Sequence, residues 1–464
     1  MSSCKSCNDF ANARRKSENM VSAIAGEGLP SIEPGMPNPA GTGLDRRQFM
    51  LRAGGMAMSV YGASKLGIGA FEEGIAHAAG APSNTVLVSV FLPGGADALS
   101  ILAPTTDPIY QAKRPNLKLV VNNSHVFADD PRLQWHPSAL GLKTLHEAGK
   151  VAVFPSIGYS HPDQSHFTSR HYWEVGALDA NANVGWLGRF LDQEGTDDNP
   201  LQGLSLGNYL APALAAERVP TASVNNPTAY DFWANGIGDP VSSVMYETFG
   251  KLGLPATNDP DLRTARRAAR QTDGVRRSMA SLVGATVSSG VTYPTSSDGF
   301  PTRLAAVAQM LSLGMPLRCV SIEAAGGYDT HSDQAAGFTR DLKLTVDTLV
   351  AFQADLEARG LADRVVIQVW SEFGRRVEQN GNSDSGSGTD HGAAGVAFLI
   401  GTKVRRQLVG EWSGLNTLDA GGNMLHTSDF RVMYAALVDQ WLGGDAAAVI
   451  PGADSMVLPT LIAA

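Results

Sequence analysis

A series of uninterrupted apolar runs, rich in β-branched residues, limits the folds that this chain can adopt. A run without polar alternation is typical of a strand that is buried on both faces, as in a parallel sheet covered by helices. Helical patterns separate the runs, most clearly at residues 339–359, where apolar positions recur with helical spacing and Gly360 ends the pattern. The predicted strands are Thr85–Leu92, Val151–Phe154, Arg318–Ala324, Val365–Trp370 and Val396–Ile400.

This alternation predicts a three-layer α/β/α sandwich with a largely parallel sheet. Polar residues that follow the strands are expected to meet at the carboxyl edge of such a sheet. Residues 201–298 interrupt the alternation with turns, aromatic residues and an arginine-rich helix at 259–283, and we interpret them as an inserted cap region. The arginines of that helix are expected to be solvated or salt-bridged rather than substrate-binding.

The N-terminal region is predicted to lie outside the fold. Residues 1–44 are rich in Gly, Pro, Ser and charged residues, which favours a disordered extension. Residues 45–78 contain the pair Arg46-Arg47, a weakly apolar stretch and the small-residue pattern Ala76-His77-Ala78, as in a twin-arginine signal peptide. The folded domain is then expected at 79–464. The twin-arginine translocase would be a partner, and the protein would be periplasmic or extracellular.

Charge and cysteine content exclude several classes. The formal net charge of −9 argues against nucleic acid as the main partner, because phosphate neutralisation needs clustered Lys and Arg. The apolar stretch of the signal is too polar and glycine-rich for a stable membrane span, and no other segment reaches spanning length. Cys319 is the single cysteine beyond the signal, so no disulfide is expected in the mature chain.

Two short motifs in the C-terminal third contain side chains that bind metals. Asp329 and His331 follow one predicted strand, and Asp390 and His391 lie between two others. Carboxylate oxygens and imidazole nitrogens on a rigid frame are what a divalent cation needs. Either motif alone also fits a turn in which Asp and His flank glycine. Together the two motifs favour a metal site.

Two more acidic residues stand at predicted strand ends. Asp97 closes the sequence Pro93-Gly94-Gly95-Ala96-Asp97 after the first strand, and Glu372 follows Val365–Trp370. Both are predicted metal ligands, although Asp97 also fits a simple turn residue.

The segment 161–171 supplies the candidate catalytic residues. Asp163 is expected to cap a helix that begins near Gln164, which would place Ser165 in the first helical turn. A hydroxyl there lies at the positive end of the helix dipole, so Ser165 is a candidate nucleophile, with His166 or Arg170 to hold an anionic group. The alternative is that Ser165 only assists the cap. His426 fits a loop residue before a helix capped by Asp429 slightly better than it fits a ligand.

A set of short motifs spread over the mature chain resembles a known family. The chain is similar to the twin-arginine-exported family called domain of unknown function one-five-zero-one, which in turn resembles the alkaline phosphatase and sulfatase superfamily. The matching motifs are Phe-Leu-Pro-Gly-Gly-Ala-Asp (91–97), Ser-His-Phe (165–167), Tyr-Trp-Glu-x-Gly (172–176), Gly-Trp-Leu-Gly-Arg (185–189), Gly-Gly-Tyr-Asp-Thr-His (326–331), Ser-Glu-Phe-Gly-Arg (371–375) and Asp-His-Gly (390–392).

The resemblance implies an alkaline phosphatase-like fold and a divalent metal, with zinc, calcium, magnesium and manganese all left open. By position it implies Asp97, Asp329, His331, Glu372, Asp390 and His391 as metal ligands and Ser165 as the nucleophile. The sequence departs from the superfamily pattern at Phe373, which stands where a ligand histidine is usual. The number of ions, one or two, is therefore open.

The function predicted from these observations is an exported, metal-dependent hydrolase of phosphate or sulfate esters. Its substrate would be a small or polymeric anionic ester. A non-catalytic exported or surface binding protein with at most one structural metal is the alternative. A third interpretation is lytic or transferase chemistry on an anionic polymer.

Overall fold

The computed structural model describes residues 84–120, 122, 125–230, 241–283, 288–383 and 385–463, and the two-residue strand β1 (Val60–Tyr61). The predicted N-terminal extension and twin-arginine signal lie outside the described residues. The larger compact unit contains residues 84–230 and 277–463, and residues 241–276 belong to a second unit. In the part of the chain that is described, no helix is both long and apolar enough to cross a membrane.

One mostly parallel sheet forms the centre of the larger unit. Its strands run in the order β7-β6-β8-β2-β9-β12-β5-β13, and β14 also pairs with β5. Most neighbouring strands of the larger unit are parallel, while β12 is antiparallel to both of its neighbours. The strands are β2 (Val86–Phe91), β5 (Val151–Gly158), β6 (Gly203–Leu206), β7 (Thr221–Ser223), β8 (Cys319–Glu323), β9 (Val365–Trp370), β12 (Gly395–Ile400), β13 (Gln407–Leu408) and β14 (Ser428–Asp429).

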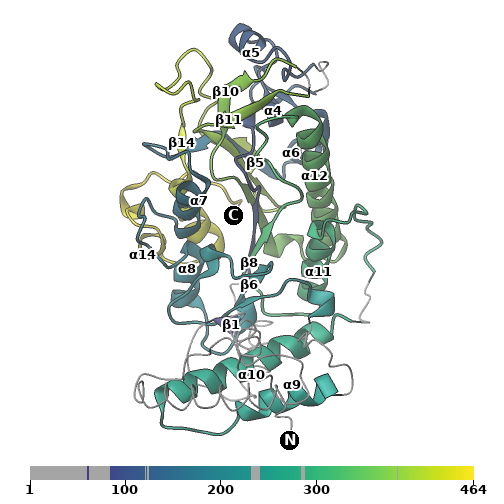
Figure 1. The fold of residues 1–464 in the computed structure, drawn as a ribbon, viewed down its shortest axis with the longest axis vertical. Coiled ribbons are helices and arrows are strands. Elements are labelled where there is room, and N and C mark those ends of the chain that lie inside the picture. The colour runs from purple at the N-terminus through teal and green to yellow at the C-terminus, as the bar shows by residue number, and fades with distance from the viewer. Residues whose placement is uncertain are drawn as a thin grey trace, which may run out of the picture. The chain divides into compact units, whose positions relative to one another are not determined.

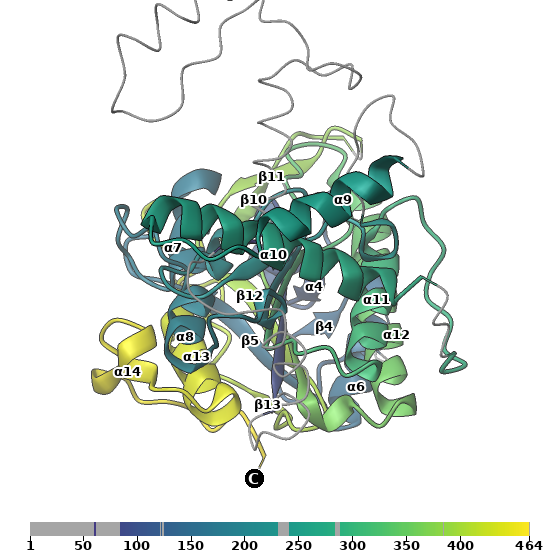
Figure 2. The same ribbon diagram turned by 90° about the horizontal axis from the view of Figure 1, so that it is seen from below.

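Helices cover both faces of this sheet (Figure 1, Figure 2). In both views α6, α11 and α12 lie on one side, and α7, α8 and α14 lie on the other. The helices of the larger unit are α4 (Ala98–Ile101), α5 (Pro108–Lys113), α6 (Leu140–Glu147), α7 (His166–Val175), α8 (Trp186–Glu194), α11 (Phe300–Ser312), α12 (Gln334–Ala358), α13 (Phe430–Leu437) and α14 (Ala446–Val449).

Short elements complete the larger unit. Two hairpin-like pairs stand apart from the main sheet: β3 (Leu102–Ala103) with β4 (Gln134–Trp135), and β10 (Arg375–Asn380) with β11 (Gly388–His391). The single-turn 3₁₀ helices are η2 (Pro137–Ala139), η3 (Pro200–Gln202), η4 (Pro212–Leu214), η5 (Pro227–Ala229), η6 (Ala362–Arg364) and η8 (Ala453–Ser455), and η7 (Val438–Leu442) is a π-helix.

The predicted fold class is confirmed: the chain is an α/β protein with a largely parallel sheet between two helical layers. Every predicted strand is present, but β12 runs antiparallel. An apolar run buried on both faces has the same pattern in either direction, so the sequence could not show this. The predicted cap region 201–298 is not one piece, because β6 and β7 are strands of the main sheet. The second unit contains α9 (Val241–Leu252) and most of α10 (Pro260–Ala280).

Adjacent parallel strands bring distant loops together. β8, β2 and β9 are neighbours in register, so the segments that follow them leave the same edge of the sheet. Backbone hydrogen bonds continue the contact beyond the strands, with Tyr328 N donating to Pro93 O at 2.8 Å and Leu92 N donating to Trp370 O at 2.8 Å. The carboxyl edge of the sheet is therefore where the acidic residues after these strands gather.

Candidate metal centre

An aromatic core holds the helix that carries His166. Trp173 of α7 stacks on Trp370 at the end of β9, with ring centroids 5.4 Å apart, and on Phe430 of α13 at 4.5 Å. Such pairs contribute about 0.5–1.5 kcal/mol each beyond their burial. Because Trp173 is 1% exposed, these contacts anchor α7 against the sheet and fix its N-terminus near the carboxyl edge.

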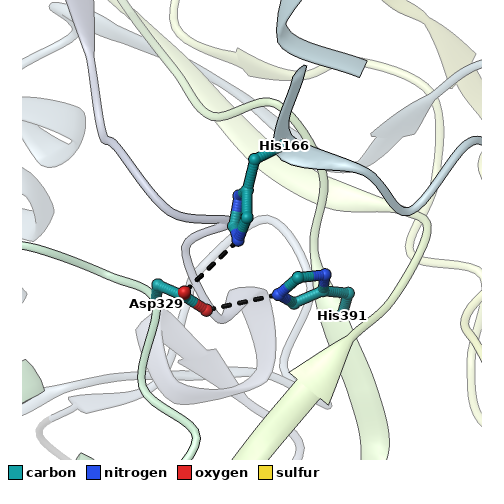
Figure 3. Close-up of side chains that lie close together, drawn as sticks. All are labelled: His166, Asp329 and His391. Carbon is teal, nitrogen blue, oxygen red and sulfur yellow. Dashed lines mark hydrogen bonds and ion pairs between the residues drawn. The ribbon is translucent and has the colours of Figure 1, made fainter. Parts of the chain in front are cut away.

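Three side chains from distant segments converge at this edge. Ligating atoms of His166, Asp329 and His391 all lie within 4.8 Å of one another (Figure 3). His166 Nε2 is 3.3 Å from Asp329 Oδ2, and His391 Nε2 is 3.3 Å from Asp329 Oδ1. They come from the start of α7, the loop after β8 and the end of β11.

His331 contacts these residues on their solvent-exposed side. Its Nε2 is 3.0 Å from Asp329 Oδ1 and 3.1 Å from His391 Nε2. The side chain of His331 is 47% exposed, whereas that of His391 is 24% exposed. Together these four residues form the His/Asp cluster, by which we mean His166, Asp329, His331 and His391.

Each histidine of the His/Asp cluster directs its Nδ1 to an acceptor. The Nδ1 of His166 lies 2.8 Å from Glu372 Oε1, and that of His391 lies 2.8 Å from the carbonyl oxygen of Gln164. The Nδ1 of His331 lies 3.1 Å from Asp390 Oδ1. A carbonyl and ionised carboxylates can only accept, so each Nδ1 carries a proton, and in the neutral form of each ring Nε2 is then an acceptor.

When the rings are neutral, the cluster therefore directs acceptors at one another. Nε2 of His166 is buried and has no hydrogen-bond partner within the described residues. Buried acceptors that face acceptors are costly unless a cation lies between them. Around an ion with bonds of about 2.0–2.1 Å, neighbouring ligand atoms lie about 2.8–3.4 Å apart, from octahedral to tetrahedral geometry. The close pairs in the cluster are 3.0–3.3 Å apart, and the ligating atoms of His166, Asp329 and His391 all lie within 4.8 Å of one another, so these residues can gather around a divalent ion.

Glu372 is buried next to the cluster and is hydrogen-bonded to His166. Its carboxylate is 2% exposed and accepts the backbone N–H of Gly94 at 3.0 Å and of Gly95 at 2.9 Å. Both glycines have positive φ, which directs their N–H groups at the carboxylate. A hydrogen bond from Nδ1 to Glu372 outweighs burial and raises the pKa of His166, which makes its Nε2 a more basic ligand.

Arg375 fixes the carboxylate of Asp329. Its guanidinium is buried and donates to Asp329 Oδ1 at 2.6 Å. It also donates to the carbonyl oxygens of Gly95 and Thr389, both at 2.8 Å. Partial burial alone would raise the pKa of Asp329, but the hydrogen bond and charge of Arg375 lower it below the usual value. Asp329 is thus held ionised.

Asp97 lies away from the His/Asp cluster. Its carboxylate is fully buried and receives Arg114 Nη1 at 2.5 Å and Nη2 at 3.0 Å. Ser100 Oγ and Gln334 Nε2 also donate to it, at 2.5 Å and 2.6 Å. The structure does not bring this predicted ligand together with the His/Asp cluster.

Of the three predicted catalytic residues, one lies in the His/Asp cluster and two lie outside it. Ser165, not Asp163, is the N-cap of α7, which begins at His166, and its Oγ accepts from Thr168 N at a long 3.5 Å. Arg170 donates to Glu174 and Glu323, both at 2.9 Å, so its guanidinium is already paired. His166 is the residue of this segment that reaches the cluster.

Sequence reasoning assigned other roles to several residues that shape the site. His166 was predicted to hold an anionic group, and Glu372 and Asp390, both predicted as metal ligands, contact histidines of the cluster instead of its centre. Phe373 packs against the rings of His166 and His391, with centroids 5.0 Å away in both cases. Glu372 and Phe373 are adjacent in the motif Ser-Glu-Phe-Gly-Arg, and both contact the imidazole of His166. This motif was therefore the sequence signal for the surroundings of His166.

The fold and the cluster together define an α/β protein with a His/Asp centre at the carboxyl edge of its sheet. The chain belongs to the family described as "Protein of unknown function (DUF1501)", whose model matches residues 162–438. That range contains every member of the His/Asp cluster. No curated protein matches the chain.

Several solved structures are similar at a coarse level. One is a protein in the alkaline phosphatase superfamily from Vibrio parahaemolyticus, with 9% identity, a TM-score of 0.35, and coverage of 87% of this chain and 81% of that chain. The sulfatase PsFucS1 from Pseudoalteromonas sp. has 11% identity, a TM-score of 0.31, and coverage of 84% and 74%. The phosphonate monoester hydrolase SpPMH from Silicibacter pomeroyi has 12% identity, a TM-score of 0.28, and coverage of 79% and 75%. Superpositions this loose do not equate individual residues.

Proposed function

We propose that this protein is a metal-dependent hydrolase of phosphate or sulfate esters. The observation that carries the proposal is the convergence of His166, Asp329 and His391, with His331 beside them, because in neutral rings the facing atoms are all acceptors. A divalent ion satisfies them together. Three imidazoles and one carboxylate favour zinc or a similar transition metal over calcium or magnesium, which prefer oxygen ligands alone.

The described side chains divide the work at this site. Glu372 orients His166 and increases its basicity, and Arg375 keeps Asp329 ionised. A divalent ion, when bound, supplies a positive charge that polarises an ester and stabilises the negative charge on its leaving oxygen. Arg170 is already paired with two carboxylates, so the anionic group of the substrate would be bound mainly by the ion.

Ser165 is the proposed nucleophile. It directly precedes His166 at the N-terminus of α7, where the helix dipole favours a developing negative charge. Its long 3.5 Å bond to Thr168 N uses the oxygen only as an acceptor and leaves its hydroxyl proton free to be transferred. If a water molecule attacks the ester instead, Ser165 serves only as the N-cap of α7.

Export by the twin-arginine pathway is part of the proposal. It rests on Arg46-Arg47 and the weakly apolar stretch after them. Because metal binding is coupled to folding, a chain that folds before it crosses a membrane can acquire its ion in the cytoplasm. The periplasm and the extracellular medium are the proposed locations.

A non-catalytic binding protein is the second candidate. Phe373 favours it, because an apolar ring packs against two of the cluster imidazoles at the position where the resemblance places a ligand histidine. A single ion would then stabilise the fold without turnover.

The first experiment is the metal content of purified protein, measured by inductively coupled plasma mass spectrometry. Wild type is expected to hold near-stoichiometric metal, and the Asp329→Ala/His391→Ala double variant is expected to lose it. Lys343→Ala, which removes an exposed ion pair on α12, is the matched control and should retain the metal. Absence of metal from wild type would sink the hydrolase proposal.

Turnover of 4-nitrophenyl phosphate and 4-nitrophenyl sulfate then separates the two candidates. A hydrolase that uses Ser165 loses turnover in Ser165→Ala while its metal content is unchanged. If metal-loaded wild type hydrolyses neither ester above the double variant, the binding protein is the better description.

A further inference from the structure

A cavity of about 270 Å³ lies beside the His/Asp cluster, along the β10–β11 hairpin. Its lining includes Lys113 at the end of α5, Arg376 and Glu378 of β10, Asp390 of β11, and Leu418. None of these residues belongs to the His/Asp cluster.

Asp390 connects the cavity with the cluster. Its Oδ1 is 3.1 Å from His331 Nδ1, and the Nε2 of the same ring is 3.0 Å from Asp329 Oδ1. One imidazole ring therefore separates a wall of the cavity from the centre of the cluster.

The charges around the cavity do not favour an anion. Lys113 is already paired with Glu378 at 2.7 Å. Arg376 lies within electrostatic range of Asp419 and shares the wall with Asp390. Two cations and two carboxylates, Glu378 and Asp390, thus line the cavity, so its wall has no net positive charge to attract a carboxylate, sulfate or phosphate group.

The same wall offers hydrogen-bonding groups that are not in use. The guanidinium of Arg376 makes no hydrogen bond within the described part of the chain, and because its Nε is buried, its Nη atoms are the donors that a ligand could reach. Across the described residues, Asp390 Oδ2 and Glu378 Oε1 have no protein donor, while the other oxygen of each carboxylate is engaged. A hydroxyl group both donates and accepts, so adjacent hydroxyls match an arginine beside a carboxylate. Leu418 and Val377 add apolar surface for a C–H face.

We propose that this cavity is a subsite for one uncharged, hydroxyl-rich sugar ring. The volume lies just below the ~300–1,000 Å³ of typical small-molecule pockets, which suits a single ring rather than an oligosaccharide. Assigning the ring to the substrate rests on the proposed hydrolase function, so that the ester would be carried on a carbohydrate. Binding of the ring itself does not depend on that function.

The test is saturation-transfer-difference NMR on the full-length protein with D-glucose, D-galactose and D-xylose, and with D-glucuronate as the anionic counterpart. Wild type is expected to bind at least one neutral sugar more tightly than glucuronate. Arg376→Gln should weaken that binding about tenfold or more, as loss of a hydrogen bond to a charged group predicts. Leu418→Trp, which fills the cavity, should abolish it, and Lys343→Gln on α12 should leave it unchanged.

His391→Ala separates this proposal from the hydrolase proposal. The variant should lose metal and keep sugar binding, because His391 does not line the cavity. Three results would each overturn the subsite: no transfer to any neutral sugar, tighter binding of glucuronate, or full binding in both Leu418→Trp and Arg376→Gln. None of these results bears on the metal content.

Discussion

Two neighbouring strands end in the same sequence pattern, Gly-Gly-x-Asp, yet their carboxylates have different environments. Asp97, after β2, is fully buried and bonded by Arg114, Ser100 and Gln334. Asp329, after β8, is 46% exposed and lies among imidazoles, although it too has an arginine partner in Arg375. An acidic strand end is thus not by itself a ligand. The number of protein donors that saturate the carboxylate decides whether oxygen remains for an ion.

Gln334 connects the two regions. Its Nε2 donates to Asp97 Oδ2 at 2.6 Å, and its Oε1 accepts from Thr389 Oγ1 at 2.6 Å. Arg114 also donates to the carbonyl oxygen of Val377 in β10 at 2.9 Å. The buried ion pair therefore holds the hairpin that ends in His391, which makes Asp97 a structural support for the cluster.

The largest expected difference is in stability. Asp97→Asn leaves Arg114 buried without its counter-charge, which should lower the free energy of unfolding by about 3–5 kcal/mol. Asp329→Asn should lower it by less in metal-free protein, because Asp329 is half exposed and Arg375 keeps four carbonyl partners. Urea denaturation at pH 7 measures both.

The surface variant Asp347→Asn, whose partner Lys343 is exposed, is the control and should change stability by less than about 1 kcal/mol. If Asp97→Asn and Asp329→Asn destabilise the protein equally, the contrast between the two strand ends is wrong.

The next effect is on metal affinity. Glu372→Gln removes the charge that orients His166, and partners of this kind typically contribute 10- to 100-fold to affinity. We expect an affinity loss of roughly that size, measured by competition with a fluorescent chelator. Glu357→Gln, which alters a surface partner of Lys150, should bind metal as wild type does. Unchanged metal affinity in Glu372→Gln would show that Glu372 does not support metal binding by His166.

A smaller effect tests the connection through Gln334. Thr389→Val breaks the bond from Thr389 Oγ1 to Gln334 Oε1 and should cost about 1 kcal/mol of stability. Because Thr389 precedes Asp390 and His391 on β11, metal affinity should also fall, by less than tenfold. A stability loss with full metal affinity would show that the two regions are independent.

The smallest expected effect is the change in the stability contribution of Asp97 as the pH falls. Burial alone would raise the pKa of Asp97, but the charge of Arg114 and the hydrogen bonds from Arg114, Ser100 and Gln334 hold it below 3.8. Ionised Asp97 therefore stabilises the fold above the unfolded-state pKa, and this stabilisation is lost as pH falls through the folded-state pKa. The stability gap between wild type and Asp97→Asn should be constant from pH 7 to 5 and shrink below pH 4. A gap that widens on acidification has the wrong sign for this pair.

The fold was largely predictable because its signals are local. The apolar runs predicted β2, β5, β8, β9 and β12, and the helical spacing of residues 339–359 predicted most of α12. Asp429 caps α13 as predicted, accepting from Arg431 N at 2.9 Å. Strand direction was not predictable for β12, and the short strands β6 and β7 carried too little apolar pattern to be recognised inside the predicted cap region.

The site was only partly predictable. Asp329, His331 and His391 were predicted from their own motifs, because donor side chains near strand ends can meet at the carboxyl edge of a sheet. The ligand position of His166, the outer positions of Glu372 and Asp390, and the removal of Asp97 into an ion pair depend on partners far away in the chain. Arg114 and Gln334, which saturate Asp97, carry no signal of that role in the sequence.

The sequence by itself determined the layers of this protein and the residue types at the carboxyl edge, because burial periodicity and turn chemistry act over a few neighbouring residues. Only the tertiary structure decided which of those residues face a common centre. That choice depends on which donors reach each carboxylate and which acceptor holds each imidazole Nδ1. Such contacts join segments more than 200 residues apart, such as His166 with Glu372 and Gln334 with Asp97.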